Sequence, residues 1–319
     1  MSPDHILREL SDLWVGLSKP TAPDAPATGV LRACTMTLMV LAEEAEDMSA
    51  LGETIAALMP EHPARAILIR LHADGPRALS ERVYAQCWMP FGQRRQICCE
   101  QVEITVSDAA LADLPSVVLP LAVADLPVIL WCRVPRLLGM PEFRAIASMA
   151  TRVLVDSAAM PDAQDALRRL ASAISRAVVG DLAWTRVTRW REMLAQLFQN
   201  RELLAQIPAI RSVRVRFGPG YETSARYLGA WISNALGGVQ PAIEADAAVP
   251  TLQLELSGDG LTIDLHRQDL RLVATVNGLS QCTNLPQPGD YILMREELAI
   301  SGRDPVFEST LLAASRLTS

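Results

Sequence analysis

The stretch Leu252–Val276, LQLELSGDGLTIDLHRQDLRLVATV, has the clearest strand pattern in the chain. Leucine and isoleucine alternate with polar residues on both sides of the turn Gly258-Asp-Gly260, and the alternation resumes after residues 267–269. A period of two places the apolar side chains on one face of a strand. The stretch therefore predicts an antiparallel meander with one face packed and the other in contact with water.

Before this stretch, apolar runs with strand character alternate with helical runs, a pattern typical of α/β domains. Strands are expected at 31–41, 64–71, 82–88, 95–106, 127–133 and 152–155, and helices at 48–59, 109–124 and 141–150. We therefore predict an α/β (α+β) protein of two domains. Residues 1–160 would form an α/β domain with a mixed sheet and a linker at about 20–29. Residues 161–319 would form a domain in which helices pack against the meander.

The composition limits the classes of function. Half of the 319 residues are hydrophobic and a fifth are charged, which is typical of a globular protein. The net charge is −7, whereas general nucleic-acid binding usually requires a basic stripe. The first residues lack the apolar segment of a signal peptide, and prolines interrupt the most hydrophobic run, Leu114–Cys132. We therefore expect a cytoplasmic protein that binds neither nucleic acid nor membrane.

The six cysteines lie mostly in apolar runs and form no CxxC pair. The ligand spacing of a zinc site is also missing, so we expect no bound metal. A disulfide network is not expected in the cytoplasm. Cys98 and Cys99 precede Glu100 and lie close to two arginines, which makes both candidate redox thiols. Their apolar strand favours a structural role as small hydrophobic residues.

The inventory for catalysis is small. The chain has four histidines, no G-x-S-x-G elbow and no glycine-rich nucleotide motif, so we expect no catalytic residue and no cofactor. His62 and Arg65 lie at the entrance of the strand expected at 64–71, where they could form a small anion site. With Glu100 they would suit a sugar-phosphate-binding enzyme or sensor. The simpler interpretation is a turn histidine that satisfies local backbone groups.

The segment Asp181–Phe198, DLAWTRVTRWREMLAQLF, holds two of the six tryptophans of a chain that is only 5% aromatic. Its apolar residues follow the spacing of one helical face. Tryptophan and arginine are enriched where proteins bind other proteins, but an apolar stripe is also typical of a core. The segment is therefore either a core helix or a docking element. The candidate partner-binding residues are Trp184, Arg186, Trp190 and Arg191.

Nine short segments, taken in order, carry a more specific signal. They are Arg32–Leu38 (RACTMTL), His62–Ile67 (HPARAI), Ile97–Glu100 (ICCE), Ser116–Leu121 (SVVLPL), Asp125–Trp131 (DLPVILW), Arg152–Ser157 (RVLVDS), Asp181–Trp184 (DLAW), Trp190–Ala195 (WREMLA) and Arg303–Glu308 (RDPVFE). In these segments the chain resembles the OpcA family of glucose-6-phosphate dehydrogenase assembly proteins. The resemblance covers nearly the whole chain after residue 30.

The resemblance implies a non-catalytic, allosteric activator that binds glucose-6-phosphate dehydrogenase and promotes its active oligomer. It would thereby raise flux into the oxidative pentose phosphate pathway. In photosynthetic members the activation is linked to thioredoxin-controlled cysteines. This chain has no CxxC pair and no cysteine beyond Cys282, so it departs from that pattern. The alternatives are the sugar-phosphate sensor described above and a redox switch through Cys98 or Cys99.

Overall fold

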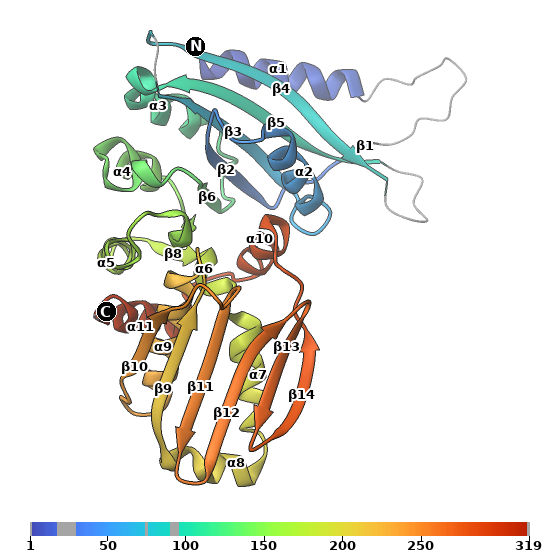
Figure 1. Ribbon diagram of the computed structural model, residues 1–319. Helices are drawn as coiled ribbons and strands as arrows, with labels where there is room; N and C mark the ends of the chain where they lie inside the picture. Colours follow the sequence, from blue (N-terminus) through green and yellow to red (C-terminus); the bar gives the residue numbers. More distant parts are fainter. Residues whose placement is uncertain (1, 18–29, 74–75, 90–95, 318–319) are drawn as a thin grey trace. The chain divides into compact units, whose positions relative to one another are not determined.

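The protein folds into two compact units, Met1–Val155 and Asp156–Ser319 (Figure 1). The structure is a computed structural model, and it describes residues 2–17, 30–73, 76–89 and 96–317. Each unit contains one sheet with helices, which confirms the predicted α/β class. The linker expected at residues 20–29 lies outside the described residues.

The sheet of the first unit is mainly parallel. Its strands are β1 (Val30–Arg32), β2 (Met36–Glu43), β3 (Ala64–His72), β4 (Leu79–Trp88), β5 (Gln96–Ser107), β6 (Val128–Cys132) and β7 (Arg152–Val155). The order β1-β5-β3-β2-β6-β7 is parallel throughout, and β4 pairs antiparallel with β5, so the sheet is mixed as predicted. Seven of the eight residues of β2 are buried, as expected for an apolar strand inside a parallel sheet.

The first unit also contains α-helices and short 3₁₀ helices. They are α1 (Pro3–Leu17), α2 (Met48–Leu58), η1 (Asp108–Asp113), α3 (Leu114–Val118), η2 (Leu119–Leu121), η3 (Pro135–Gly139) and α4 (Pro141–Ala147). The single helix predicted at 109–124 is instead the succession η1, α3 and η2. Pro115 and Pro120 stand at the starts of α3 and η2, where a residue without an amide hydrogen is tolerated, so the helix is divided there.

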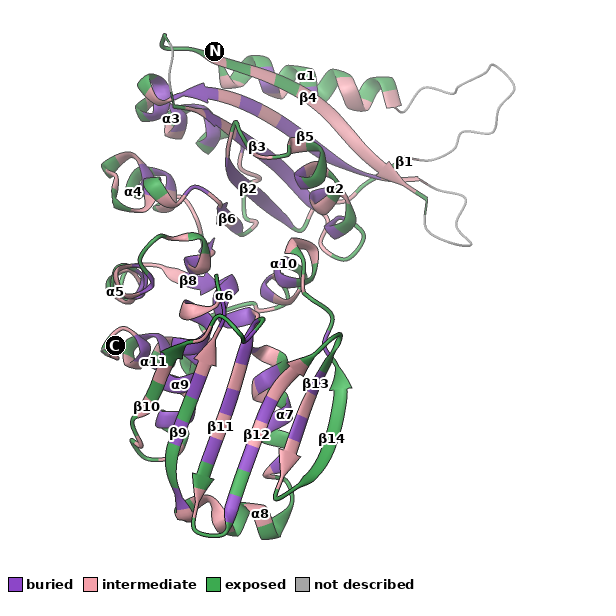
Figure 2. Ribbon diagram, in the orientation of Figure 1, coloured by how far each residue is buried: buried purple, intermediate pink, exposed green. Residues whose placement is uncertain are grey.

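The second unit contains the predicted meander. Its sheet has the order β10-β9-β11-β12-β13-β14 and is antiparallel except for the parallel pair β9 and β10. The strands are β9 (Ile210–Phe217), β10 (Pro241–Ala245), β11 (Leu252–Gly258), β12 (Leu261–Gln268), β13 (Arg271–Val276) and β14 (Leu279–Asn284). The register sets Leu254 opposite Leu265, and Leu265 opposite Ala274, on the packed face. Alternating burial along β11 and β12 confirms that one face is packed and the other is wet (Figure 2).

The second unit also contains helices and one short strand that is not part of this sheet. They are η4 (Ser157–Ala159), α5 (Ala163–Ala173), β8 (Val178–Asp181), α6 (Leu182–Thr185), α7 (Thr188–Leu197), α8 (Arg201–Gln206), η5 (Ile207–Ala209), α9 (Glu222–Ala235), α10 (Asp290–Leu298) and α11 (Pro305–Ala314). Helix α9 packs against β9 and β10. The tryptophan-rich segment 181–198 is two helices, α6 and α7, which are separated at residues 186–187.

A buried carboxylate organises the core of the second unit. Asp181 is fully buried and caps α6 by accepting a hydrogen bond from the amide of Ala183 at 3.0 Å. It also accepts one from the amide of Ser157 at 3.0 Å and one from the Tyr227 hydroxyl at 2.7 Å. Burial raises the pKa of the Asp181 carboxyl, so these three donors offset a large desolvation cost.

Aromatic rings pack beside this carboxylate. The Trp184 ring lies 5.8 Å from Tyr227 and 6.0 Å from Phe307, measured between ring centroids. Trp184 and Trp190 are each only 3% exposed. Both tryptophans therefore belong to the core of this unit, and neither presents its ring at the surface.

We predict that Trp184→Ala and Trp190→Ala each lower the free energy of unfolding by about 3–5 kcal/mol, because each leaves a large cavity. Urea denaturation followed by circular dichroism measures the change. Trp231→Ala is the matched control: this tryptophan lies half-buried on α9 of the same unit, so its loss should cost less. Wild-type stability in both core variants would contradict the placement of these rings.

Candidate partner-binding surface

The arginines of the tryptophan-rich segment are engaged within their own unit. The guanidinium of Arg186 donates to both carboxylate oxygens of Asp156, at 2.7 and 2.5 Å. The guanidinium carbon of Arg191 lies 3.5 Å from the centroid of the Trp184 ring. Burial lowers the pKa of Arg191 to about 10. Of the four residues predicted to bind a partner, two are thus core rings and two are arginines that hold this core together.

The polar side of α7 faces a hollow. Its volume is about 540 Å³, and it lies between α7, α10 and residues 283–288. Thr188, Glu192 and Gln196 line it from α7, and Ile292 and Glu296 line it from α10. The hollow is therefore a place where polar side chains of the tryptophan-rich segment reach the surface.

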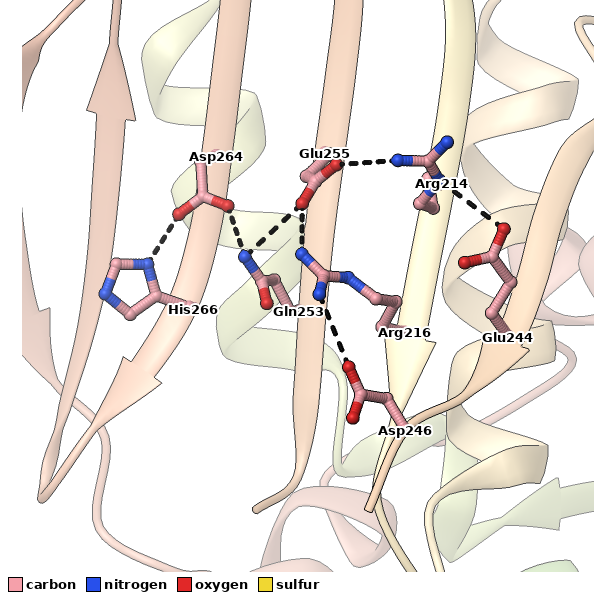
Figure 3. Close-up of polar contacts among 8 residues, drawn as sticks. All are labelled: Arg214, Arg216, Glu244, Asp246, Gln253, Glu255, Asp264 and His266. Carbon is pink, nitrogen blue, oxygen red and sulfur yellow. Dashed lines mark hydrogen bonds and ion pairs between the residues drawn. The ribbon is translucent and has the colours of Figure 1, made fainter. Parts of the chain in front are cut away.

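The open face of the second sheet carries a row of ion pairs, shown in Figure 3. Arg214 of β9 lies between Glu244 and Glu255, each at 3.4 Å. Arg216, two residues further along β9, pairs with Glu255 and with Asp246, the latter at 3.3 Å. These side chains are about one third to one half exposed, so their pairs are screened by water.

The row continues across β11 and β12. The amide nitrogen of Gln253 donates to Asp264 at 2.8 Å, and the other oxygen of Asp264 lies 2.5 Å from the His266 ring nitrogen (Figure 3). Beyond β12 the open face carries one charged residue of the described strands, the exposed Arg271 of β13, and Thr275 and Ser280 share a hydrogen bond at 2.8 Å. The open face therefore combines an ordered row of charges on β9 to β12 with a less charged part on β13 and β14.

Strand β14 is an unprotected sheet edge. Among the described strands it pairs only with β13, and all six of its residues are exposed, with Leu279 at 81%. Its sequence, LSQCTN, contains no lysine and no proline, the residues by which exposed edges are usually protected from pairing with another chain. The sequence patterns did not predict this strand, because apolar alternation, the signal used for β11 and β12, is absent from it.

In the first unit, Arg65 and Glu100 form a buried ion pair. The guanidinium of Arg65 donates to the Glu100 carboxylate at 2.5 Å. The same carboxylate pairs with Arg32 at 2.7 Å and accepts a hydrogen bond from the indole nitrogen of Trp14 at 2.5 Å. The structure records no contact between His62 and this described cluster. The proposed set of His62, Arg65 and Glu100 is therefore not assembled, and the Glu100 carboxylate occupies the position that an anion would take beside Arg65.

The cysteines of β4 and β5 lie in direct register. Cys87 stands opposite Cys98, and the two form a disulfide. This differs from the expectation of no disulfide, since cross-strand register brings together residues whose spacing carries no sequence signal. Cys99 is a buried free thiol, and burial raises its pKa to about 11. A high pKa disfavours the nucleophilic thiolate, so Cys99 is poorly suited to redox chemistry in this state.

The topology of the first sheet has a switch point between β2 and β6, since the chain runs from β2 to β3 on one side and from β6 to β7 on the other. In sheets of this kind, dinucleotides bind outside the carboxyl ends of the strands at such a point, above a glycine-rich turn. Here the turn after β2 is Glu43-Glu-Ala-Glu-Asp47, without glycine. Glu43 pairs with Arg136 at 2.6 Å, and Glu46 pairs with Arg133 at 2.6 Å.

The helix N-terminus at this switch point is also occupied. The Asp47 carboxylate accepts hydrogen bonds from the amides of Ser49 and Ala50, at 2.9 and 3.2 Å, at the start of α2. In dinucleotide-binding folds these amides bind the pyrophosphate. The crevice therefore contains the chain's own carboxylates where a cofactor would place negative charge.

Within the described ranges, no cluster of histidine, cysteine, aspartate or glutamate has the arrangement of a metal site. No described helix combines the length and the apolar character needed to cross a membrane.

The buried and exposed ion pairs should differ in their effect on stability. Arg65→Ala should lower the free energy of unfolding by about 3–5 kcal/mol, because it leaves Glu100 buried with one partner fewer. Arg214→Ala on the open face should change it by only about 0–1 kcal/mol. Chemical denaturation of both variants measures this difference. Equal effects would show that the Glu100 cluster is more solvated than its 3% exposure indicates.

Comparison with known proteins identifies the family. Residues 55–172 match the family described as the glucose-6-phosphate dehydrogenase subunit N-terminal domain (OpcA, assembly), and residues 177–311 match its C-terminal domain. An OxPP cycle protein described as OpcA from Synechocystis sp. is 26% identical over 193 residues, covering 59% of this chain and 39% of that protein. The corresponding protein of Nostoc punctiforme is 26% identical over 141 residues, covering 44% and 30%. The matched region thus spans less than half the length of these relatives.

A solved structure supports the fold alone. A NAD binding oxidoreductase from Klebsiella pneumoniae superposes with a TM-score of 0.51 and 11% sequence identity, covering 90% of this chain and 94% of that chain. The two family domains follow one another and together cover most of the chain. On this basis the chain belongs to the OpcA family of glucose-6-phosphate dehydrogenase assembly proteins.

Proposed function

We propose that this protein is a non-catalytic assembly factor that binds glucose-6-phosphate dehydrogenase and favours its active oligomer. The observation that carries the proposal is the match of both OpcA domains, in order, to one chain. The role would place the protein in the cytoplasm, in support of the oxidative pentose phosphate pathway.

The filled switch point supports a role without catalysis. An oxidoreductase on this fold needs a glycine turn and a free helix N-terminus for the cofactor pyrophosphate. In this chain, Glu43 and Glu46 hold arginines across the crevice, and Asp47 caps α2. Binding a dinucleotide there would require breaking these ion pairs and bringing phosphate charge beside three carboxylates.

We assign the dehydrogenase contact to the open face of the second sheet and to the edge strand β14. The edge offers unpaired backbone groups to an extended strand of a partner, a common mode of recognition. The charged row at Arg214, Arg216 and Glu255 would supply specificity, because its side chains are already ordered by mutual contacts. The uncharged side chains of β14 could be desolvated at little cost.

Mass action then gives the activation. A protein that binds the active assembly of the dehydrogenase more tightly than the inactive form shifts the population toward the active assembly. A difference of about 1–3 kcal/mol in binding free energy, which is roughly 5–150-fold, is typical of such coupling.

The test is an activation assay that combines purified dehydrogenase with a variant of this protein carrying added lysines on β14. The double variant Ser280→Lys/Cys282→Lys should weaken dehydrogenase binding about tenfold or more, because lysines on an edge strand oppose pairing. Its melting temperature should stay at the wild-type value, since both side chains are exposed. The activity of the dehydrogenase measures activation, and the mass of the copurified complex measures assembly.

Leu204→Lys on α8 is the control, because it places a lysine at an exposed apolar position away from the sheet edge. It should activate like the wild type. Full activation by the edge variant would reject β14 as the contact, whereas failure of the wild type to bind the dehydrogenase would reject the proposed function itself.

A further inference from the structure

A second, smaller hollow lies on the helix-covered side of the second sheet. It adjoins the hollow between α7 and α10. Its volume is about 130 Å³, and Arg186, Arg267, Thr251, Tyr221 and Gln287 are among the residues that line it. We propose that this hollow is a binding site for the phosphate group of a small phosphorylated metabolite, and we call it the Thr251 site. This assignment does not depend on the dehydrogenase contact.

An unpartnered buried hydroxyl points to a ligand. Thr251 is 6% exposed, and its hydroxyl oxygen is fully buried with no hydrogen-bond partner among the described residues. A buried hydroxyl without a partner is unfavourable by about 1–3 kcal/mol, and native proteins usually avoid it. A phosphate oxygen in the hollow would accept the missing hydrogen bond.

The backbone holds Thr251 in place through a close approach. The amide of Gly218 donates to the Thr251 carbonyl at 2.8 Å, and a side chain at Gly218 would meet the Val249 carbonyl oxygen at 2.1 Å. The same turn leads to Tyr221, whose amide donates to the Gly218 carbonyl at 3.2 Å. The turn at 218–220, which has no sequence signature of a nucleotide loop, thus positions two residues of the site.

The charge of the hollow suits an anion. Arg186 is balanced by Asp156, with which it makes two hydrogen bonds. Arg267 donates through Nε to the Asp269 carbonyl at 2.8 Å, and its terminal nitrogens have no recorded partner within the described part of the chain. The site therefore has one guanidinium available, and guanidinium groups bind phosphate oxygens with matching geometry.

The size limits the ligand. A volume of about 130 Å³ corresponds to the space of roughly four water molecules, which suits a phosphate group. Arg186, Gln287 and Pro288 also line the larger hollow, so the two hollows adjoin. The larger one presents Thr188 and Gln196, whose polar groups suit the hydroxyls of a sugar. The combined shape fits a sugar phosphate.

Titration calorimetry on the isolated full chain tests the site, with glucose 6-phosphate, inorganic phosphate and glucose as probes. We expect the two phosphates to bind with dissociation constants below about 1 mM and glucose to show no binding. Tighter binding of the sugar ester than of phosphate would extend the site into the larger hollow, whereas equal binding would confine it to the phosphate. No binding of either phosphate overturns the proposal.

Two variants locate the binding. Thr251→Val and Arg267→Gln should each weaken phosphate binding about tenfold or more, since each removes a bond to a charged ligand. Thr251→Val should not lower the melting temperature, because the hydroxyl that it removes has no partner in the free protein. Arg271→Gln, an exposed arginine on β13, is the matched control and should bind like the wild type. Wild-type affinity in both site variants overturns the assignment.

Discussion

The burial of the Asp181 carboxylate is the constraint on which the second unit depends. A carboxylate removed from water is stable only when donors surround it, and here the donors come from residues 157, 183 and 227. These three positions belong to η4, α6 and α9, which are distant in sequence. The Trp184, Tyr227 and Phe307 rings pack beside the carboxylate and exclude water, so the polar and aromatic contacts reinforce one another.

The segments that resemble the family and the surface assigned to the partner are therefore different parts of this unit. Three of those segments, Arg152–Ser157, Asp181–Trp184 and Arg303–Glu308, supply Asp156, Ser157, Asp181, Trp184 and Phe307 to one cluster. Their residue types are constrained by packing and by the need to satisfy a buried charge. The open face and β14 have no such constraint, which leaves them available for recognition.

In the first unit, the edge of the sheet at the switch point is occupied by ion pairs of the chain itself. The parallel sheet and the switch point at β2 and β6 have the geometry of a dinucleotide-binding domain. The local chemistry is opposite, since carboxylates and ion pairs occupy the crevice and cap the helix. The fold alone therefore says little about activity, which depends on the residues at this one edge of the sheet.

The sequence by itself determined the fold class, the meander from Leu252 to Val276 and the faces of its strands, because hydrophobic period is a local property. It also indicated the family through ordered segments. It left open whether Trp190 is core, did not predict β14, and expected no disulfide where Cys87 meets Cys98. Only the tertiary structure decided these points, since they depend on which distant segments pack together. The neutralisation of Arg65 by Glu100, 35 residues away, has the same origin.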